Sequence, residues 1–167
     1  KVMDKKMTIC FIGCGRFAKF FVPLFKAHPV VEKVYVCDQI RERAEEYSKE
    51  FDVEIIETFE DALASEEINA VAIFTPRTTH GQNVIKSLKA GKHVLCEKPI
   101  ASNHSEFERM REAAEKAGVV LLEAMRPAFD TALEAVRENL PRIGKLRRAS
   151  LEFCQYSSRY DKYRAGE

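Results

Sequence analysis

Residues 8–18 read TICFIGCGRFA and combine a short apolar run, a glycine turn and the start of an apolar-periodic helix. Gly13 allows a sharp turn at the end of the strand, and Gly15 leaves room for a diphosphate to approach the backbone. Ala18 lets the helix pack closely on the strand. Because free N–H groups at a helix N-terminus bind phosphates, the stretch predicts a dinucleotide-binding strand, turn and helix.

A second strand-like run follows at residues 34–37 and ends in Asp38, about 20 residues beyond Ala18. A carboxylate at this place accepts hydrogen bonds from the adenosine ribose and repels a 2′-phosphate, which favours NAD over NADP. Arg41 and Arg43 lie close enough in sequence to accommodate such a phosphate, so NADP stays open. The alternative is that the glycines serve the turn alone and that Asp38 caps the next helix. The order of strand, turn, helix, strand and acid favours nucleotide binding.

The composition describes a protein with one sizeable core. The chain has 167 residues, of which 46% are hydrophobic, and its charged residues nearly cancel. We therefore expect neither a nucleic acid nor an acidic membrane as a partner. No apolar run approaches the ~20 residues of a membrane span, and no apolar signal segment precedes the first strand, which predicts a cytoplasmic protein. The five cysteines show no metal-ligand spacing, so we expect reduced core thiols and no metal.

Strands and helices are predicted to alternate along the first three quarters of the chain. The expected strands are residues 8–12, 34–37, 53–56, 69–74, 93–96 and 119–122. The expected helices are residues 16–27, 41–51, 60–64, 80–90 and 103–117. This rhythm predicts an α/β fold with a doubly wound parallel Rossmann sheet over residues 1–122, with ligands at the carboxyl ends of the strands.

The pattern changes beyond residue 122. Residues 127–140 predict one amphipathic helix, residues 146–156 alternate as in a strand with one exposed face, and residues 157–167 are polar without a pattern. A helix and one strand do not make a domain, so we expect residues 123–167 to be the start of an incomplete C-terminal α+β domain. An unpaired strand exposes an edge, which predicts self-association or instability.

Residues 97–99, Glu-Lys-Pro, follow a predicted strand and carry the second candidate site. A lysine beside a nicotinamide can donate a hydrogen bond to a substrate oxygen and stabilise charge during hydride transfer. The glutamate could hold that lysine or a ribose. The alternative is a surface ion pair, which contributes little to stability.

Four motifs in this order resemble the Gfo/Idh/MocA family of NAD(P)-dependent oxidoreductases, which includes glucose-fructose oxidoreductase, inositol dehydrogenase and dimeric dihydrodiol dehydrogenase. The motifs are residues 13–18 (GCGRFA), Thr75-Pro76 followed by His80, residues 90–94 (AGKHV) and residues 97–99 (EKP). The resemblance implies an N-terminal Rossmann domain and a C-terminal α+β domain whose sheet forms homo-oligomer contacts. It also implies hydride transfer between a nicotinamide cofactor and a sugar, polyol or related alcohol or carbonyl substrate.

The same resemblance assigns roles to single residues. It makes Lys98 the catalytic lysine, Glu97 a contact of the nicotinamide ribose, and Arg126 a residue that faces the substrate, for which a surface charge is the alternative. It also implies a Lys98–Pro99 bond that is often cis. The expected cofactor-binding residues are Gly13, Gly15, Arg16, Phe17, Ala18, Asp38, Thr75, Pro76, His80, Glu97 and Lys98.

Two departures from the family pattern affect these expectations. Arg77 follows Thr-Pro where the family has a polar or small residue, and the family's Asp-Gly-x-x-His sequence, which supplies a proton-transfer histidine, has no counterpart before Glu167. The family's proteins are roughly twice this length. We therefore expect these residues alone to bind nucleotide and to turn over weakly or not at all. The alternative function is a non-catalytic nucleotide-binding regulator or binding module of the same fold.

Overall fold

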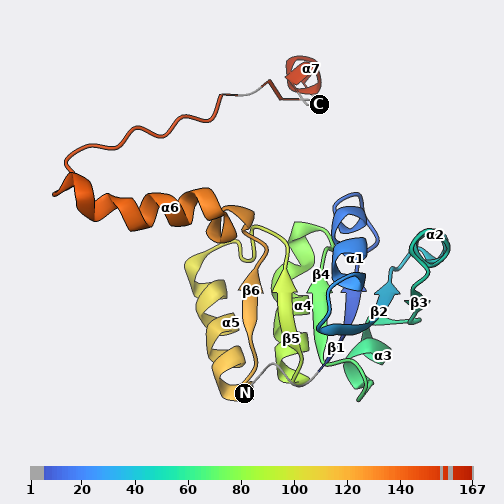
Figure 1. Ribbon diagram of the computed structural model, residues 1–167. Coiled ribbons are helices and arrows are strands. Elements are labelled where there is room, and N and C mark those ends of the chain that lie inside the picture. The colour runs from blue at the N-terminus through green and yellow to red at the C-terminus, as the bar shows by residue number, and fades with distance from the viewer. Residues whose placement is uncertain (1–5, 155, 158–159, 167) are drawn as a thin grey trace. The chain divides into compact units, whose positions relative to one another are not determined.

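The computed structural model describes residues 6–154, 156–157 and 160–166. Within them six parallel strands form one sheet in the order β3-β2-β1-β4-β5-β6 (Figure 1). The strands are β1 Met7–Ile12, β2 Val31–Cys37, β3 Glu54–Ile55, β4 Ala70–Ile73, β5 His93–Cys96 and β6 Leu121–Glu123. The predicted α/β fold with a doubly wound Rossmann sheet is confirmed.

Helices connect the strands and cover both faces of the sheet. They are α1 Ala18–Lys26, α2 Arg41–Phe51, α3 Phe59–Ala64, α4 His80–Lys89 and α5 His104–Ala117, with the short 3-10 helix η1 Arg77–Thr79 before α4. Side chains of α1 and α2 pack in one core cluster, and side chains of α3, α4 and α5 pack in the other. The predicted elements of this part of the chain are all present, with small shifts at their ends.

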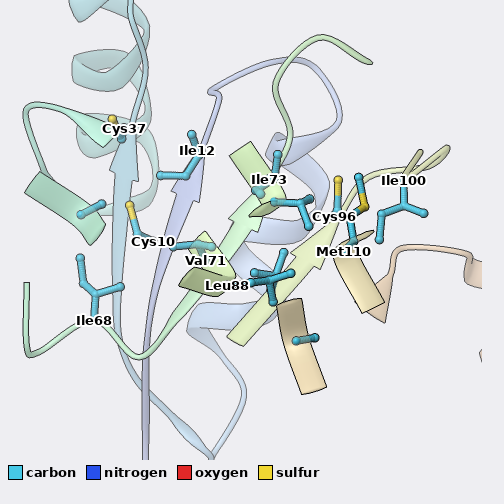
Figure 2. Close-up of a cluster of buried hydrophobic side chains, with 14 residues drawn as sticks. Cys10, Ile12, Cys37, Ile68, Val71, Ile73, Leu88, Cys96, Ile100 and Met110 are labelled. Carbon is cyan, nitrogen blue, oxygen red and sulfur yellow. The ribbon is translucent and has the colours of Figure 1, made fainter. Parts of the chain in front are cut away.

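The central strands are apolar on both faces, as a buried parallel sheet requires. In β1, Cys10 and Ile12 belong to one core cluster, whereas Ile9 and Phe11 belong to the other. Figure 2 shows the first cluster, in which side chains from β1 and β4 lie with Leu88 of α4 and Met110 of α5. The continuous apolar runs of the sequence thus fill two cores, one on each side of the sheet.

Local signals fix the ends of the helices. The Thr58 hydroxyl accepts a 3.0 Å hydrogen bond from the Asp61 N–H at the start of α3, and the Asn103 side chain accepts one of 2.9 Å from the Glu106 N–H at the start of α5. Gly118 ends α5 in the left-handed conformation, with φ of +66°. These caps explain why the helix boundaries could be predicted closely.

Residue contacts divide the chain into one unit up to Met125 and a second from Arg126, and each is described by itself. The second unit contains η2 Arg126–Phe129, α6 Thr131–Asn139, η3 Leu140–Ile143 and α7 Tyr160–Arg164. The single helix predicted over residues 127–140 is therefore shorter than expected, because Asp130 caps α6 by accepting a 2.8 Å hydrogen bond from the Ala132 N–H. The predicted division into residues 1–122 and 123–167 stays a prediction.

The strand predicted over residues 146–156 is wrong for the residues that the structure describes. Residues 146–154 and 156 are in neither a strand nor a helix, and Leu151 and Phe153 are 96% and 85% exposed. Alternation is a local signal, whereas a strand needs a neighbour for its backbone hydrogen bonds. Within the polar stretch 157–167, for which the sequence shows no pattern, residues Tyr160–Arg164 form α7. Residues 155, 158–159 and 167 lie outside the described part. No described helix has the length and apolar character of a membrane span.

Candidate nucleotide site at the carboxyl edge of the sheet

The glycine turn after β1 lies directly against the neighbouring strands. Gly13 has φ of +99°, and its N–H donates a 2.8 Å hydrogen bond to the Cys37 carbonyl oxygen. A Cβ on Gly13 would lie 2.8 Å from the Phe74 carbonyl carbon and oxygen and 2.9 Å from the Thr75 nitrogen. Glycine at this position therefore lets the end of β1 pass close to the end of β4.

Gly15, by contrast, borders open space. A Cβ added there would meet no atom within 4 Å, and the Gly15 carbonyl oxygen accepts a 2.5 Å hydrogen bond from the Tyr47 hydroxyl. Arg16 and Phe17 are exposed, whereas Ala18 is fully buried at the start of α1. No side chain caps α1, and its first turn contains no acidic residue. The turn therefore offers backbone N–H groups and free space to an anion.

Asp38 stabilises this turn. Its Oδ2 accepts a 2.7 Å hydrogen bond from the Cys14 N–H, and its Oδ1 accepts one of 2.8 Å from the Ile40 N–H. The carboxylate thus joins the end of β2 to the glycine turn, a role that the sequence did not reveal. Because each carboxylate oxygen has two lone pairs, both can still accept a hydrogen bond from a ribose hydroxyl.

Replacement of Asp38 should therefore lower stability as well as change nucleotide binding. We expect Asp38→Ala to reduce the free energy of unfolding by about 1–2 kcal/mol, because two backbone N–H groups lose their acceptor. Asp38→Asn retains one oxygen that can accept a hydrogen bond, so its free energy of unfolding should lie between that of Asp38→Ala and that of the unchanged chain. Urea unfolding followed by circular dichroism measures both. Equal midpoints for Asp38→Ala and the unchanged chain would show that the turn does not depend on this carboxylate.

His80 connects the loops that follow β4 and β5. The residue is only 3% exposed, and its ring places Nδ1 2.9 Å from the Pro99 carbonyl oxygen and Nε2 2.9 Å from the Thr75 carbonyl oxygen. Both ring nitrogens are thus occupied by backbone atoms of the protein. The sequence predicts a cofactor contact for His80, whereas this geometry favours a tether between the loops that carry Thr75 and Lys98.

The Thr75 hydroxyl belongs to a small polar network. The Thr79 hydroxyl lies 2.8 Å from Thr75 Oγ1 and 2.8 Å from the Pro76 carbonyl oxygen, and the Asn83 amide donates a hydrogen bond to Thr75 Oγ1 at 3.2 Å. The Pro76 carbonyl oxygen can only accept, so it takes the single hydroxyl hydrogen of Thr79, and the Thr75 hydroxyl then donates its own hydrogen to Thr79 Oγ1. Pro76 and Arg77 follow Thr75 and are exposed.

Glu97 and Lys98 lie at the same edge of the sheet, directly after β5. The Glu97 N–H donates a 2.9 Å hydrogen bond to the Ile73 carbonyl oxygen at the end of β4. Lys98 is exposed, and its ammonium group forms no hydrogen bond or ion pair with the residues that the structure describes. The Lys98–Pro99 bond is cis, as the resemblance implies. The alternative of a surface ion pair between Glu97 and Lys98 is therefore not what forms within the described residues.

Glu123, at the end of β6, was not predicted. Its Oε1 accepts a 2.9 Å hydrogen bond from the Ile100 N–H and so holds the segment after the cis bond. Burial, and then the charges of Glu123 and Glu97, raise the pKa of the Cys96 thiol to about 12. The only signal in the sequence was an acid at the end of a predicted strand.

The thiols at this edge are neutral groups of the core. Burial, and then the Asp38 carboxylate, raise the pKa of Cys14 to about 12 and that of Cys37 to about 11. The free cysteines are buried at positions 10, 14, 37 and 96 and exposed at position 154. Neutral, buried thiols are poor nucleophiles, so they serve packing rather than chemistry.

The predicted site residues of the first unit thus meet along one edge of the sheet. Contacts run from Asp38 through the glycine turn to Thr75, and from Thr75 through His80 to the segment that carries Lys98. Arg126 is different, because it opens the second unit. Its role toward a substrate stays a prediction.

Three comparisons relate this geometry to known proteins. The chain is 40% identical over 132 residues to scyllo-inositol 2-dehydrogenase (NADP(+)) IolU of Bacillus subtilis, covering 78% of this chain and 40% of that protein. It resembles the 3-ketoreductase KijD10 from Actinomadura kijaniata, solved with NADP and TDP-benzene, with a TM-score of 0.77 and 26% identity over 83% of this chain and 43% of that one. It also resembles the WlbA dehydrogenase from Bordetella pertussis, solved with NADH and UDP-GlcNAcA, with a TM-score of 0.76 and 25% identity over 85% and 41% of the two chains.

The chain spans less than half the length of these three proteins. Residues 7–125 match the family model described as the oxidoreductase family with an NAD-binding Rossmann fold, which covers the whole sheet. This match extends over well more than half of the chain and includes every motif of the carboxyl edge. The chain therefore belongs to the Gfo/Idh/MocA oxidoreductase family.

Proposed function

We propose that this chain binds a nicotinamide dinucleotide at the carboxyl edge of its sheet, as part of an oxidoreductase that acts on a sugar, polyol or related alcohol or carbonyl. The observation that carries the proposal is the uncapped glycine turn, where a Cβ on Gly15 would meet no atom within 4 Å. A diphosphate fits such a turn because it needs both backbone N–H donors and close approach. The donor set therefore fits the cofactor.

Each residue of the edge has a defined task in this proposal. The turn at Gly15 binds the diphosphate, Asp38 accepts hydrogen bonds from the adenosine ribose, and the loop at Thr75 and Pro76 passes along the cofactor. Glu97 contacts the second ribose. The exposed residues beside the cofactor are Arg16, Phe17 and Pro76. His80 joins the loop that carries Thr75 to the loop that carries Lys98.

Lys98 carries the chemistry that the chain itself supplies. The bound nicotinamide accepts or gives up hydride. The exposed Lys98 ammonium group donates a hydrogen bond to the substrate oxygen, whose negative charge grows or shrinks as the hydride moves. An ammonium group without a partner among the described residues is available for this contact. The relatives named above use NADP or were solved with NADH or NADP, so the preference for NAD rests on Asp38 of this chain.

The proposal includes a cytoplasmic location, homo-oligomerisation through a C-terminal sheet and contact of Arg126 with the substrate. It also includes weak or no turnover by these 167 residues alone. Robust dehydrogenase activity with a polyol substrate would contradict that last point.

The direct test is a calorimetric titration with NADH and, separately, with NADPH, since the chain has no Trp for fluorescence. We expect saturable binding of NADH, with NADPH weaker. Lys98→Met should leave the affinity for NADH within about threefold, because the lysine faces the substrate and not the diphosphate. Failure of both nucleotides to bind would contradict the proposal. A loss of NADH binding in Lys98→Met would show that Lys98 contacts the cofactor rather than the substrate.

A further inference from the structure

Arg41 and Arg43, the two arginines that follow Asp38, differ in their side-chain contacts. Arg41 Nε donates a 2.9 Å hydrogen bond to Glu45 Oε1 on the next turn of α2. Arg41 Nη1 donates another to Glu57 Oε2, which comes from the segment after β3. Two of the three donor nitrogens of the Arg41 side chain, Nε and Nη1, thus have carboxylate partners. An arginine held in this way has fewer donors left for a phosphate.

Arg43 is exposed and forms no side-chain hydrogen bond or ion pair with the described residues. Its positive charge opposes the rise in the pKa of the Cys14 thiol in the glycine turn. Arg41 and Arg43 are therefore not equivalent, although the sequence presents both as candidates for a 2′-phosphate contact.

The end of β2 is also surrounded by negative charge. Burial is the main cause that raises the pKa of the Cys37 thiol to about 11. The further causes are the negative charges of four carboxylates, those of Asp38, Asp61, Glu60 and Glu57. Glu57 is the member of this group that pairs with Arg41, whereas Glu60 pairs with Lys86 of α4 at 3.2 Å. Glu57 and Glu60 thus both raise the pKa of Cys37 at the end of β2, but Glu57 pairs with Arg41 and Glu60 pairs with Lys86.

We infer that Glu57 determines cofactor specificity by holding Arg41 away from the place of an adenosine 2′-phosphate, and so favours NAD. This inference rests on the proposed nucleotide site and extends it to a residue outside the glycine motif. Arg41 and Glu57 are 51% and 65% exposed, and exposed ion pairs are weak. The ion pair therefore keeps Arg41 from a 2′-phosphate only in part. Loss of the pair should change the ratio of NADPH to NADH affinity by a moderate factor rather than by orders of magnitude.

The test is the ratio of NADPH to NADH affinity, measured by calorimetry. Glu57→Gln should raise this ratio by about fivefold, mainly through tighter binding of NADPH, because the Nη1 group released from the Glu57 carboxylate can meet the phosphate while Nε stays on Glu45. Glu60→Gln is the matched control, since it removes one negative charge from the same group without freeing Arg41. It should change the ratio by less than about twofold. The gain of Glu57→Gln should disappear when Arg41→Ala is added.

Each possible result decides the question. An unchanged ratio in Glu57→Gln, an equal rise in Glu60→Gln, or a gain that persists with Arg41→Ala would each overturn the inference while NADH binding still supports the nucleotide site. If the unchanged chain binds neither nucleotide, the proposed function fails and this inference fails with it. Thermal unfolding of each variant checks that these exposed substitutions leave the fold intact.

Discussion

Gly13→Ala should reduce the free energy of unfolding by about 3 kcal/mol and abolish NADH binding. The new methyl group would lie 2.8 Å from the carbonyl group of Phe74 and 2.9 Å from the Thr75 nitrogen. These are backbone atoms of the neighbouring strand and its loop, so no side chain can rotate away to relieve the contact. The φ of +99° adds strain for any residue with a Cβ. Because domains have only about 5–15 kcal/mol of stability, this loss is a large fraction.

Two other glycines separate the causes of that effect. Gly118→Ala keeps a positive φ of +66° but places its Cβ in open space, so it should cost only about 1 kcal/mol. Gly15→Ala has neither a clash nor a positive φ, so its stability should stay within about 1 kcal/mol of the unchanged chain. Its affinity for NADH should nevertheless fall by about tenfold or more, because the methyl group occupies the space of the diphosphate.

Urea unfolding and calorimetric titration with NADH measure these effects on the same samples. If Gly13→Ala lost no more stability than Gly118→Ala, the close approach to Phe74 would not constrain the turn. If Gly15→Ala bound NADH as the unchanged chain does, the open space at Gly15 would not be where the diphosphate lies. That second result would contradict the proposed site without bearing on the fold.

The fold could be predicted because its signals are local. Apolar runs such as that before Gly13 form strands buried on both faces, and a strand, turn and helix repeated in order leave few topologies. The carboxyl edge followed from the same logic, because the ends of parallel strands meet there. Residues at strand ends, among them Asp38 and Lys98, were therefore expected together, and the structure places them on this edge.

The contacts within the edge could not be predicted, because they join segments far apart in the sequence. The bond from the Cys14 N–H to Asp38, the position of the His80 ring between two loops, and the pair of Arg41 with Glu57 all depend on where the chain folds back. The wrong strand over residues 146–156 has the opposite cause. Its local pattern is strong, but the described residues from Arg126 onward contain no strand with which it could pair.

Lys92 is the residue whose importance the sequence concealed most fully. It appeared only as one letter of a motif, yet its side chain is buried, with the whole residue 7% exposed. Its ammonium group donates hydrogen bonds of 2.6 Å to the Ser65 carbonyl oxygen and 2.7 Å to the Ile68 carbonyl oxygen. These acceptors belong to the segment between α3 and β4. Lys92 therefore connects that segment to the start of β5. This is the amino end of the strand, whereas the nucleotide site lies at the carboxyl ends of the strands.

We expect Lys92→Met to lower the free energy of unfolding by about 2 kcal/mol. Methionine fills similar space but leaves two carbonyl groups without their donor, and hydrogen bonds to charged groups contribute about 1.5–3 kcal/mol each. Part of this loss is offset, since burial lowers the pKa of Lys92 and thus shows that the buried charge has a cost. Lys89→Met, at an exposed lysine in the last turn of α4, is the matched control and should stay within about 0.5 kcal/mol.

The pH dependence of unfolding gives an independent check of the same residue. Because the pKa of Lys92 is lower in the folded state than in the unfolded state, the unfolded state binds more protons just below the ordinary lysine pKa. The contribution of Lys92 to stability should therefore rise with pH through that window, and this rise should be absent in Lys92→Met. NADH affinity should not change, since the residue lies at the other edge of the sheet. A Lys92→Met chain at least as stable as the unchanged one would show that the cost of burying the charge exceeds the value of its two hydrogen bonds.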